Sequence, residues 1–191
     1  MKNQAGASSK EKILLEATRI AQAHGYNGLN VRDLAGAVGI KAASVYHHFA
    51  SKADLGAAVA KRYWEDSEAT LHAMEDAYGS PLECLRSYPL TFRKALERDN
   101  RICLCSFMAA EADDLPEEIK KEVRKFAEVN IAWLKRMLVA SGKLPAKECE
   151  RRAETIFAAV AGAQLIARSR SDVAAYDQLV AGYVSAGLIP A

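Results

Sequence analysis

Apolar residues recur every three or four positions along almost the whole chain, which is the spacing of one face of an α-helix. Nine segments carry this pattern, and Gly, Pro or a capping residue such as Ser or Asn stands at many of their ends. The predicted helices cover residues 9–24, 31–38, 41–49, 51–79, 80–96, 101–114, 116–141, 145–170 and 172–186. The pattern therefore predicts an all-α protein of about nine helices.

Residues 29–55 contain two short helices joined by a glycine turn. Asn30 is placed to cap the first helix, because its side chain can accept from the next backbone N–H groups. Gly39 follows the last apolar position of that helix, where a left-handed backbone ends a helix without a Cβ penalty. Such a pair is a helix-turn-helix, in which the second helix reads DNA, or an ordinary helical hairpin.

The second of these helices has two different faces. Ala42, Val45 and Phe49 fall on one face, and small polar residues fall on the other. The polar face carries no acid, and lysines stand at both of its ends. Small side chains let a helix enter the major groove, while Lys, Tyr and Ser reach phosphates or base edges.

The amino-acid sequence of this region closely resembles the DNA-binding module of the tetracycline-repressor (TetR) family over about residues 10–64. Three segments agree in order and spacing: Leu-Asn-Val-Arg-Asp-Leu-Ala, then Val-Gly-Ile-Lys-Ala-Ala-Ser-Val-Tyr-His-His-Phe, then Ser-Lys-Ala-Asp-Leu. Asn30 stands where the family often has Thr, and both residues cap helices. Ala42 and Ala43 replace the family's common Gly, Pro or Thr, which removes side-chain hydrogen bonding at positions that help to choose an operator.

The resemblance implies which residues contact DNA. Arg32 and His47 are expected at the bases, and Tyr46 and Lys52 at phosphates. The full predicted set is Arg32, Lys41, Ala42, Ala43, Ser44, Tyr46, His47, His48 and Lys52. His48 has an alternative place, packed under the turn.

The resemblance also implies two domains. Residues 1–55 form the helix-turn-helix DNA-binding domain, and residues 56–191 form a larger helical domain for ligand binding and dimerisation. The helix at about 52–78 connects them, and in the family its tilt converts ligand binding into operator release. A plain connecting helix is the other interpretation of this segment.

A ligand pocket is expected in the second domain. Pro89 lies inside an apolar helical pattern and should kink or split that helix, which leaves room beside it. Asn130 and Trp133 are three residues apart, so a polar group lies beside an aromatic wall. Such a pocket suits a small, largely apolar effector, although each residue also suits ordinary core packing. The predicted lining is Phe92, Cys103, Phe107, Asn130, Trp133, Met137 and Gln164.

The last two helices resemble the family's dimerisation region, where they pair with their copies as a four-helix bundle. A homodimer also suits a palindromic operator, because a two-fold protein reads two half-sites. The predicted interface is Phe157, Val160, Ala161, Gln164, Leu165, Tyr176, Val180, Tyr183 and Val184.

Charge is distributed unevenly along the chain. The net charge of the 191 residues is +2, but residues 1–63 carry +5 and the remainder carries −3. A basic N-terminal module fits phosphate binding at one end only. No apolar run approaches the roughly 20 residues of a membrane span, and no signal peptide is recognisable, so a cytoplasmic location is expected.

The sequence does not indicate an enzyme, a metal site or a cofactor. It has no Gly-rich phosphate loop, nucleophile elbow or metal-ligand spacing, and its four cysteines form no CxxC. Cys103 or Cys105 could sense electrophiles, with Arg101 favouring the thiolate, or both could simply fill apolar space. The predicted function is a ligand-responsive transcriptional regulator, most simply a repressor. The alternatives are a thiol-sensing regulator, an activator or architectural protein, and a helical interaction protein without specific DNA binding.

Overall fold

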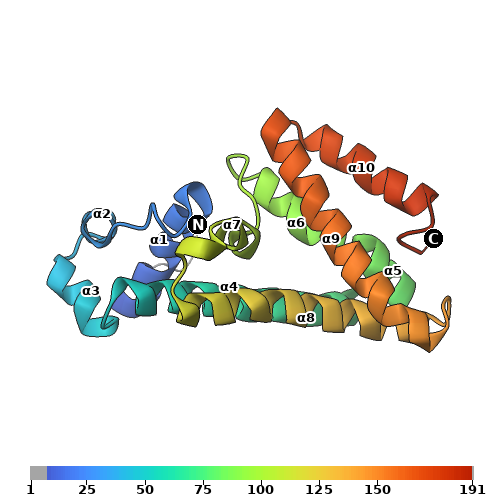
Figure 1. The fold of residues 1–191 in the computed structure, drawn as a ribbon, viewed down its shortest axis with the longest axis horizontal. Coiled ribbons are helices and arrows are strands. Elements are labelled where there is room, and N and C mark those ends of the chain that lie inside the picture. Colours follow the sequence, from blue (N-terminus) through green and yellow to red (C-terminus); the bar gives the residue numbers. More distant parts are fainter. Residues whose placement is uncertain (1–7, 191) are drawn as a thin grey trace. The chain divides into compact units, whose positions relative to one another are not determined.

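The structure is a computed structural model that describes residues 8–190. Within that range it contains α-helices, one 3-10 helix and no strand, so the all-α prediction is confirmed (Figure 1). The helices are α1 Ser9–His24, α2 Val31–Val38, α3 Ala42–His48, α4 Lys52–Tyr78, α5 Pro81–Ser87, α6 Pro89–Leu96, α7 Leu104–Ala110, η1 Ala112–Asp114, α8 Glu117–Ser141, α9 Ala146–Arg170 and α10 Val173–Ser185.

Pro89 splits the predicted helix 80–96 into α5 and α6. Proline has no N–H for the helical ladder and its ring crowds the preceding turn, so an uninterrupted helix is unfavourable. Tyr88, between the two helices, keeps helical dihedrals of −51° and −44°, so the chain bends without leaving the helical region. The split confirms the prediction at Pro89 and adds one helix to the expected set.

The predicted helix 101–114 is too long. Asp99 and Asn100 have positive φ values of 56° and 54°, so a turn precedes this segment. The backbone N–H of Cys103 donates to Gln164 Oε1 at 2.9 Å, and α7 begins only at Leu104. The expectation that Cys103 and Cys105 lie two residues apart on one helix is therefore wrong.

Contacts divide the chain into two compact units. The first, which we call the head, contains the described residues up to Trp64 together with Leu104–Arg124. The second, the body, contains Glu65–Cys103 and the described residues from Lys125 onward. Two of the three boundaries along the chain fall inside the long helices α4 and α8, and the third lies at the start of α7. The predicted division at residue 55 stays a prediction.

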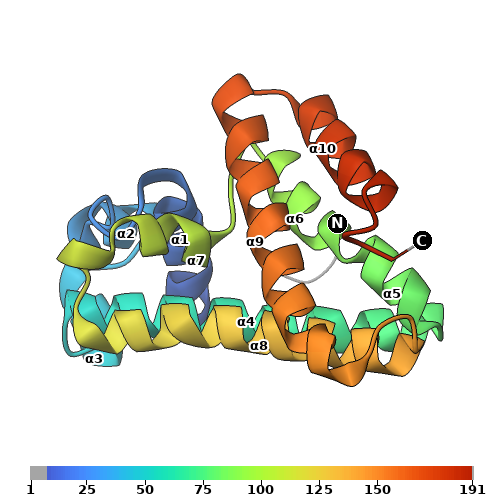
Figure 2. The same cartoon turned by 45° about the vertical axis from the view of Figure 1, so that its right-hand side comes forward.

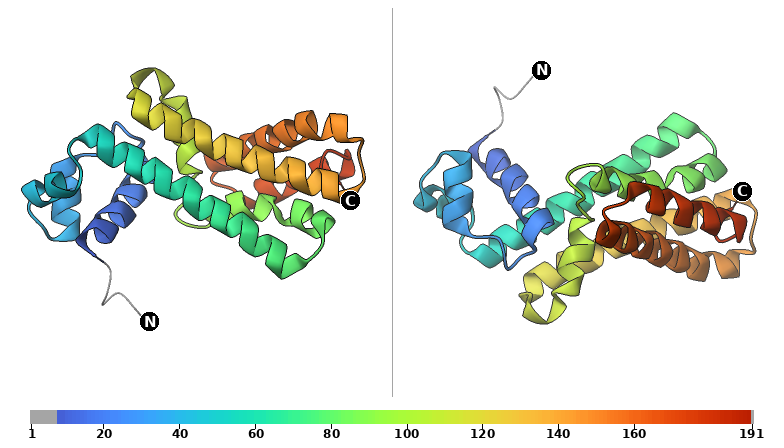
Figure 3. Two further views of the ribbon diagram at one scale, coloured as in Figure 1. Left: turned by 90° about the horizontal axis from the view of Figure 1, so that it is seen from below. Right: turned by 90° about the horizontal axis from the view of Figure 1, so that it is seen from above.

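The head is built around one apolar core. The helices α1, α2 and α3 pack together beside the first turns of α4 (Figure 3). Arg62 of α4 donates to Glu11 of α1 at 2.9 Å, and this hydrogen bond lowers the pKa of the Glu11 carboxyl. Fully buried side chains come from every α-helix of the head and include Ile13, Leu34, Val45, Leu55, Val59, Met108 and Ile119.

The body is organised by α9, which packs against both α10 and α6. Figure 2 shows α9 and α10 side by side and running in opposite directions. An aromatic cluster joins α6, α8 and α9: Phe92 contacts Phe126 and Phe157, with ring centroids 6.4 and 6.2 Å away. Edge-on aromatic pairs at such distances add to the stabilisation that burial provides.

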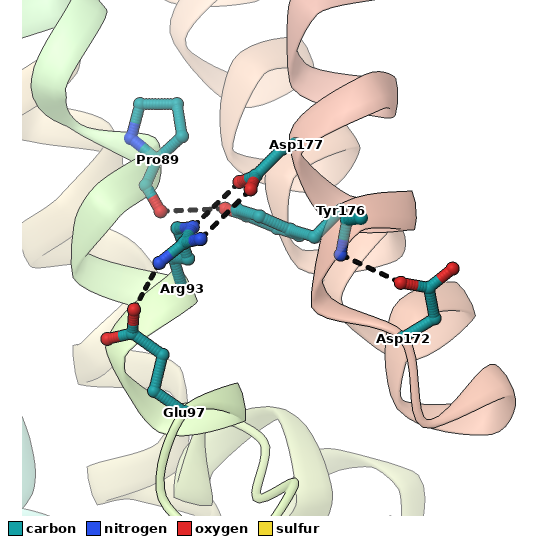
Figure 4. A network of polar contacts seen from close by, with 7 residues as sticks. Pro89, Arg93, Glu97, Asp172, Tyr176 and Asp177 are labelled. Atoms are coloured by element: carbon teal, nitrogen blue, oxygen red, sulfur yellow. Dashed lines mark hydrogen bonds and ion pairs between the residues drawn. The ribbon is translucent and has the colours of Figure 1, made fainter.

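Polar contacts fix α10 to α6 within the body. The Tyr176 hydroxyl donates to the Pro89 carbonyl at 2.7 Å, and Arg93 holds both carboxylate oxygens of Asp177 at 2.7 and 2.9 Å (Figure 4). Arg93 also donates to Glu97. Burial raises the pKa of the Tyr176 phenol, so this side chain remains a neutral donor.

Gln164 is fully buried and uses both ends of its amide. Its Oε1 accepts from the Cys103 N–H at 2.9 Å, and its Nε2 donates to the Phe92 carbonyl at 2.5 Å. One side chain of α9 thus joins α6 to the turn that precedes α7. Such a group must be hydrogen-bonded, because burying an amide without partners is costly.

Replacing Gly56 by alanine should destabilise the head. A Cβ there would lie 2.6 Å from Ile119 Cδ1 and 2.9 Å from a Tyr26 ring carbon. Overpacking costs about 1–3 kcal/mol, against at most about 1 kcal/mol gained in helix propensity. Gly36→Ala is the control, since it is also helical but has nothing within 4 Å. Urea unfolding followed by circular dichroism should show Gly56→Ala less stable than Gly36→Ala; equal stabilisation by both would contradict the packing argument.

Replacing Gln164 by alanine should destabilise the body by roughly 2–4 kcal/mol, because it leaves the Cys103 N–H unsatisfied and opens a cavity. Gln178→Ala removes the same side chain from an exposed position on α10 and should change the free energy of unfolding by less than about 0.5 kcal/mol. Urea unfolding of both variants measures the difference. Similar values for the two would show that the buried amide is not needed.

Candidate nucleic-acid interface

The turn between α2 and α3 has the geometry that its sequence predicts. Asn30 Oδ1 accepts from the backbone N–H of Arg32 at 2.8 Å, which confirms the predicted cap. Gly39 has φ 76° and ψ 32°, the left-handed conformation, and so ends α2 without steric cost. The N–H of Ile40 then donates back to the Ala35 carbonyl at 2.9 Å. The chain therefore enters α3 in a defined direction.

Packing sets the orientation of α3. Its seven residues are too few to form a stable helix alone. Val45 is 1% exposed and Phe49, which follows the helix, is 5% exposed, so one face is held in the head core. The opposite face is consequently fixed toward solvent.

That outward face carries most of the predicted DNA contacts. Ala43, Ser44 and His47 are exposed, and Tyr46 is 51% exposed. α3 has no acidic residue. Arg32 on α2 and Lys41 before α3 are exposed as well. These side chains are accessible to a ligand as large as a DNA duplex.

Three predicted contacts are half-buried and therefore less accessible: Ala42, His48 and Lys52. Ala42 is half-buried and packs against the head core. His48 is half-buried with its ring edge-on to Phe49, at a centroid distance of 6.5 Å. His48 thus packs beside the turn, as the alternative interpretation expected, and contributes less outward surface than His47.

Lys52 is held by its neighbours at the start of α4. Its Nζ lies 4.5 Å from the centroid of the Tyr26 ring and 3.3 Å from the Asn27 carbonyl oxygen, to which it donates. Lys10 Nζ lies 5.7 Å from the Phe49 ring centroid, which adds a second cation near the end of α3. A lysine has three donors, so these contacts leave capacity for a phosphate.

Sequence reasoning missed the contact that supports Tyr26. Glu111 Oε2 accepts from the Tyr26 N–H at 2.7 Å, across 85 positions of the chain. Burial raises the pKa of the Tyr26 phenol, and the charge of Glu118 raises it further. Neither Tyr26 nor Glu111 belongs to a repeated pattern. Only the glycine before Tyr26 indicates an unusual backbone conformation at this place.

Six of the seven predicted pocket residues lie buried in the body. Asn130 Oδ1 accepts from the Tyr88 hydroxyl at 3.0 Å, and Asn130 Nδ2 donates to the Phe126 carbonyl at 2.8 Å. The Trp133 ring stacks on Tyr88 with a centroid distance of 5.8 Å. Phe107, the seventh, is half-buried on α7 in the head.

Tyr88 is the residue of this cluster that sequence reasoning missed. It is fully buried, and burial raises its pKa well above the ordinary tyrosine value, so it stays a neutral hydrogen-bond donor. The Trp133 Nε1 donates to Glu75 at 2.8 Å, where Arg136 pairs with the same carboxylate. The only signal in the sequence was its position immediately before Pro89.

The predicted dimer residues separate into two groups. Val160, Gln164 and Tyr176 are at most 1% exposed within one chain, so they pack inside the body and cannot themselves contact a second copy in this conformation. Leu165 is 49% exposed. The remaining members, Phe157, Ala161, Val180, Tyr183 and Val184, are half-buried, and their role in dimerisation stays a prediction.

All four cysteines are buried, and none forms a disulfide. Cys103 and Cys105 are 1% and 2% exposed. Burial also raises the pKa of Cys84, which disfavours its thiolate. Reactive thiols need a stabilised thiolate and access to the reagent, so burial argues against the thiol-sensing alternative.

Residues 8–190 hold no group of three or more side chains arranged to bind a metal ion. None of the described helices has the length and apolar character needed to cross a membrane.

Comparison with known proteins identifies the head. Residues 9–59 match the family model described as bacterial regulatory proteins, tetR family. The match covers α1, the helix-turn-helix and the start of α4, which are the elements that present the outward face of α3.

Solved structures extend the likeness to the whole chain. A TetR transcriptional regulator from Legionella pneumophila is 29% identical, with a TM-score of 0.89 over 96% of this chain and 99% of its own. A TetR-family regulator from Agrobacterium tumefaciens is also 29% identical, with a TM-score of 0.87 over 96% and 98%.

A curated relative, the HTH-type transcriptional repressor KstR2 of Mycolicibacterium smegmatis, is 30% identical over 125 residues. The match spans 62% of this chain and 61% of that relative. The predicted recognition is thus supported by a family model over residues 9–59 and by structural likeness over 96% of the chain. Residues 9–59 belong to the tetR family of bacterial regulatory proteins, and the chain as a whole has the fold of solved TetR regulators.

Proposed function

We propose that the protein is a sequence-specific DNA-binding transcriptional regulator in which α3 enters the major groove. The observation that carries this proposal is the outward face of α3, which is exposed, free of acids and fixed by the burial of Val45 and Phe49. Arg32 and His47 contact base edges, while Tyr46 and Lys52 contact phosphates. The positive charge of residues 1–63 supports this assignment.

The regulator acts as a homodimer on a palindromic operator. Leu165 and Ile166 of α9 are 49% and 45% exposed. The half-buried Phe157 also lies on α9, and the half-buried Tyr183 and Val184 lie on α10. Large exposed apolar side chains gathered on one element favour a protein partner. Repression is the direction we propose, since the curated relative is named as a repressor.

The body binds a small, uncharged effector. Among the buried side chains of residues 8–190, the polar groups are the amides of Asn130 and Gln164 together with those of tyrosine, tryptophan and cysteine, and none carries a formal charge. A charged ligand would therefore lack a compensating partner in this core. The aromatic side chains around Tyr88 offer apolar contact area, and Asn130 or Tyr88 could exchange an internal hydrogen bond for one to the ligand.

The first test is selection of genomic DNA fragments by the purified protein at near-physiological salt, followed by sequencing. The expected outcome is enrichment of one short palindrome, because a two-fold dimer reads two half-sites about one helical turn apart. Failure to enrich any sequence, at low salt as well, would overturn the proposal and favour an interaction protein that keeps the helix-turn-helix as scaffold.

Lys52→Ala and His47→Ala should weaken operator binding in different ways. Loss of a phosphate contact lowers affinity for all sequences about equally and reduces the salt slope by about 1, whereas loss of a base contact costs about 1–3 kcal/mol and relaxes specificity at one position. Fluorescence anisotropy on the operator and on single-base variants, over a salt series, separates the two. Lys143→Ala, which removes an exposed cation from the body, is the control. A change of sequence preference in Lys52→Ala would contradict its assignment to a phosphate.

A further inference from the structure

The carboxylate of Glu111 lies against the backbone of the loop that follows α1. Its Oε2 accepts from the Tyr26 N–H at 2.7 Å. Gly25, the preceding residue, has φ +70°, and a Cβ there would lie 2.4 Å from both carboxylate oxygens. The carboxylate therefore occupies the space that a side chain at residue 25 would need. A charge-assisted hydrogen bond of this kind is stronger than a neutral one.

The two residues that follow Gly25 hold Lys52. The Tyr26 ring lies under the Lys52 ammonium at 4.5 Å, and the Asn27 carbonyl accepts from it at 3.3 Å. Tyr26 also packs against α4, since a Cβ at Gly56 would approach its ring to 2.9 Å. Glu111 thus fixes a short stretch of backbone whose next atoms fix the lysine at the start of α4.

The benefit for binding is entropic. A free lysine side chain loses conformational entropy when a ligand orders it, so a lysine ordered in advance binds more tightly. All of these contacts lie within the head. They join Glu111, which follows α7, to Lys52, the first residue of α4.

We infer that Glu111 is a positioning residue for DNA binding: it holds the backbone of Tyr26 and Asn27, and through them it orders the Lys52 ammonium for a phosphate. This inference rests on the proposed function. It assigns a role in binding to a segment, residues 104–115, that lies outside the matched DNA-binding module.

Glu122 provides a matched control. It is a second carboxylate of the head, and its Oε2 accepts from the Trp64 Nε1 at 2.8 Å. That bond joins α8 to α4 as the Glu111 bond joins the residue after α7 to the loop after α1, but it holds the Trp64 side chain and not the Tyr26–Asn27 backbone that contacts Lys52. Loss of either carboxylate removes one hydrogen bond between distant segments of the head.

The experiment measures duplex affinity by anisotropy for Glu111→Ala, Glu111→Gln and Glu122→Ala, each alone and combined with Lys52→Ala. The probes are the selected operator and a random-sequence duplex at low salt. Glu111→Ala should weaken binding about threefold or more on both probes and reduce the salt slope, as expected when one phosphate contact is impaired. Glu111→Gln, which keeps an acceptor, should restore most of the affinity, and Glu122→Ala should leave it within about twofold.

The combination with Lys52→Ala decides the route. If Glu111 acts through Lys52, Glu111→Ala should have little further effect once the lysine is absent. Equal losses for Glu111→Ala and Glu122→Ala, or a loss that persists in the Lys52→Ala background, would overturn the inference while leaving the proposed function standing. If the selection yields no operator but the wild-type protein binds the random duplex, specific recognition is overturned. The random duplex then still tests the role of Glu111. Absence of binding to either probe would overturn both.

Discussion

The contact of α3 with the rest of the head is the constraint on which the other features depend. A helix of seven residues has no independent stability, so the burial of Val45 and Phe49 decides both that it forms and which way it faces. The left-handed Gly39 and the Asn30 cap set the angle at which the chain arrives. The buried face of α3 holds the helix in the head core, and this packing fixes the direction of its exposed face. A change that disturbs the packing of the buried face would therefore also move the exposed face.

The segment from Cys103 to Glu111 is fixed at both ends by side chains that bind backbone N–H groups. Gln164 accepts from the Cys103 N–H in the body, and Glu111 accepts from the Tyr26 N–H in the head. Between them stands α7, a helix of seven residues. Covalent continuity alone makes this segment a connection between the two units, in addition to α4 and α8.

The elements that could be predicted from the sequence were those with local causes. Helix periodicity, the Asn30 cap, the Gly39 turn and the break at Pro89 each depend on a few neighbouring residues, and the structure confirms them. The failures lay where distant contacts override the local pattern. Cys103 looked helical, but its N–H is bound by a side chain of α9. Val160 and Tyr176 looked like interface residues, because the apolar pattern of a helix does not distinguish an inner face from an outer one.

An all-α chain with a helix-turn-helix, and the set of residues around α3, could be predicted from the sequence, because helical period, capping residues and a specific local sequence carry that information. Which of those residues are accessible depends on tertiary packing: His47 faces outward, while His48 lies against Phe49. It also decided that Glu111 supports Tyr26 and that Tyr88 donates to Asn130. Such pairs are set by packing between segments far apart in the chain, and no local pattern encodes which distant side chain will fill a given space.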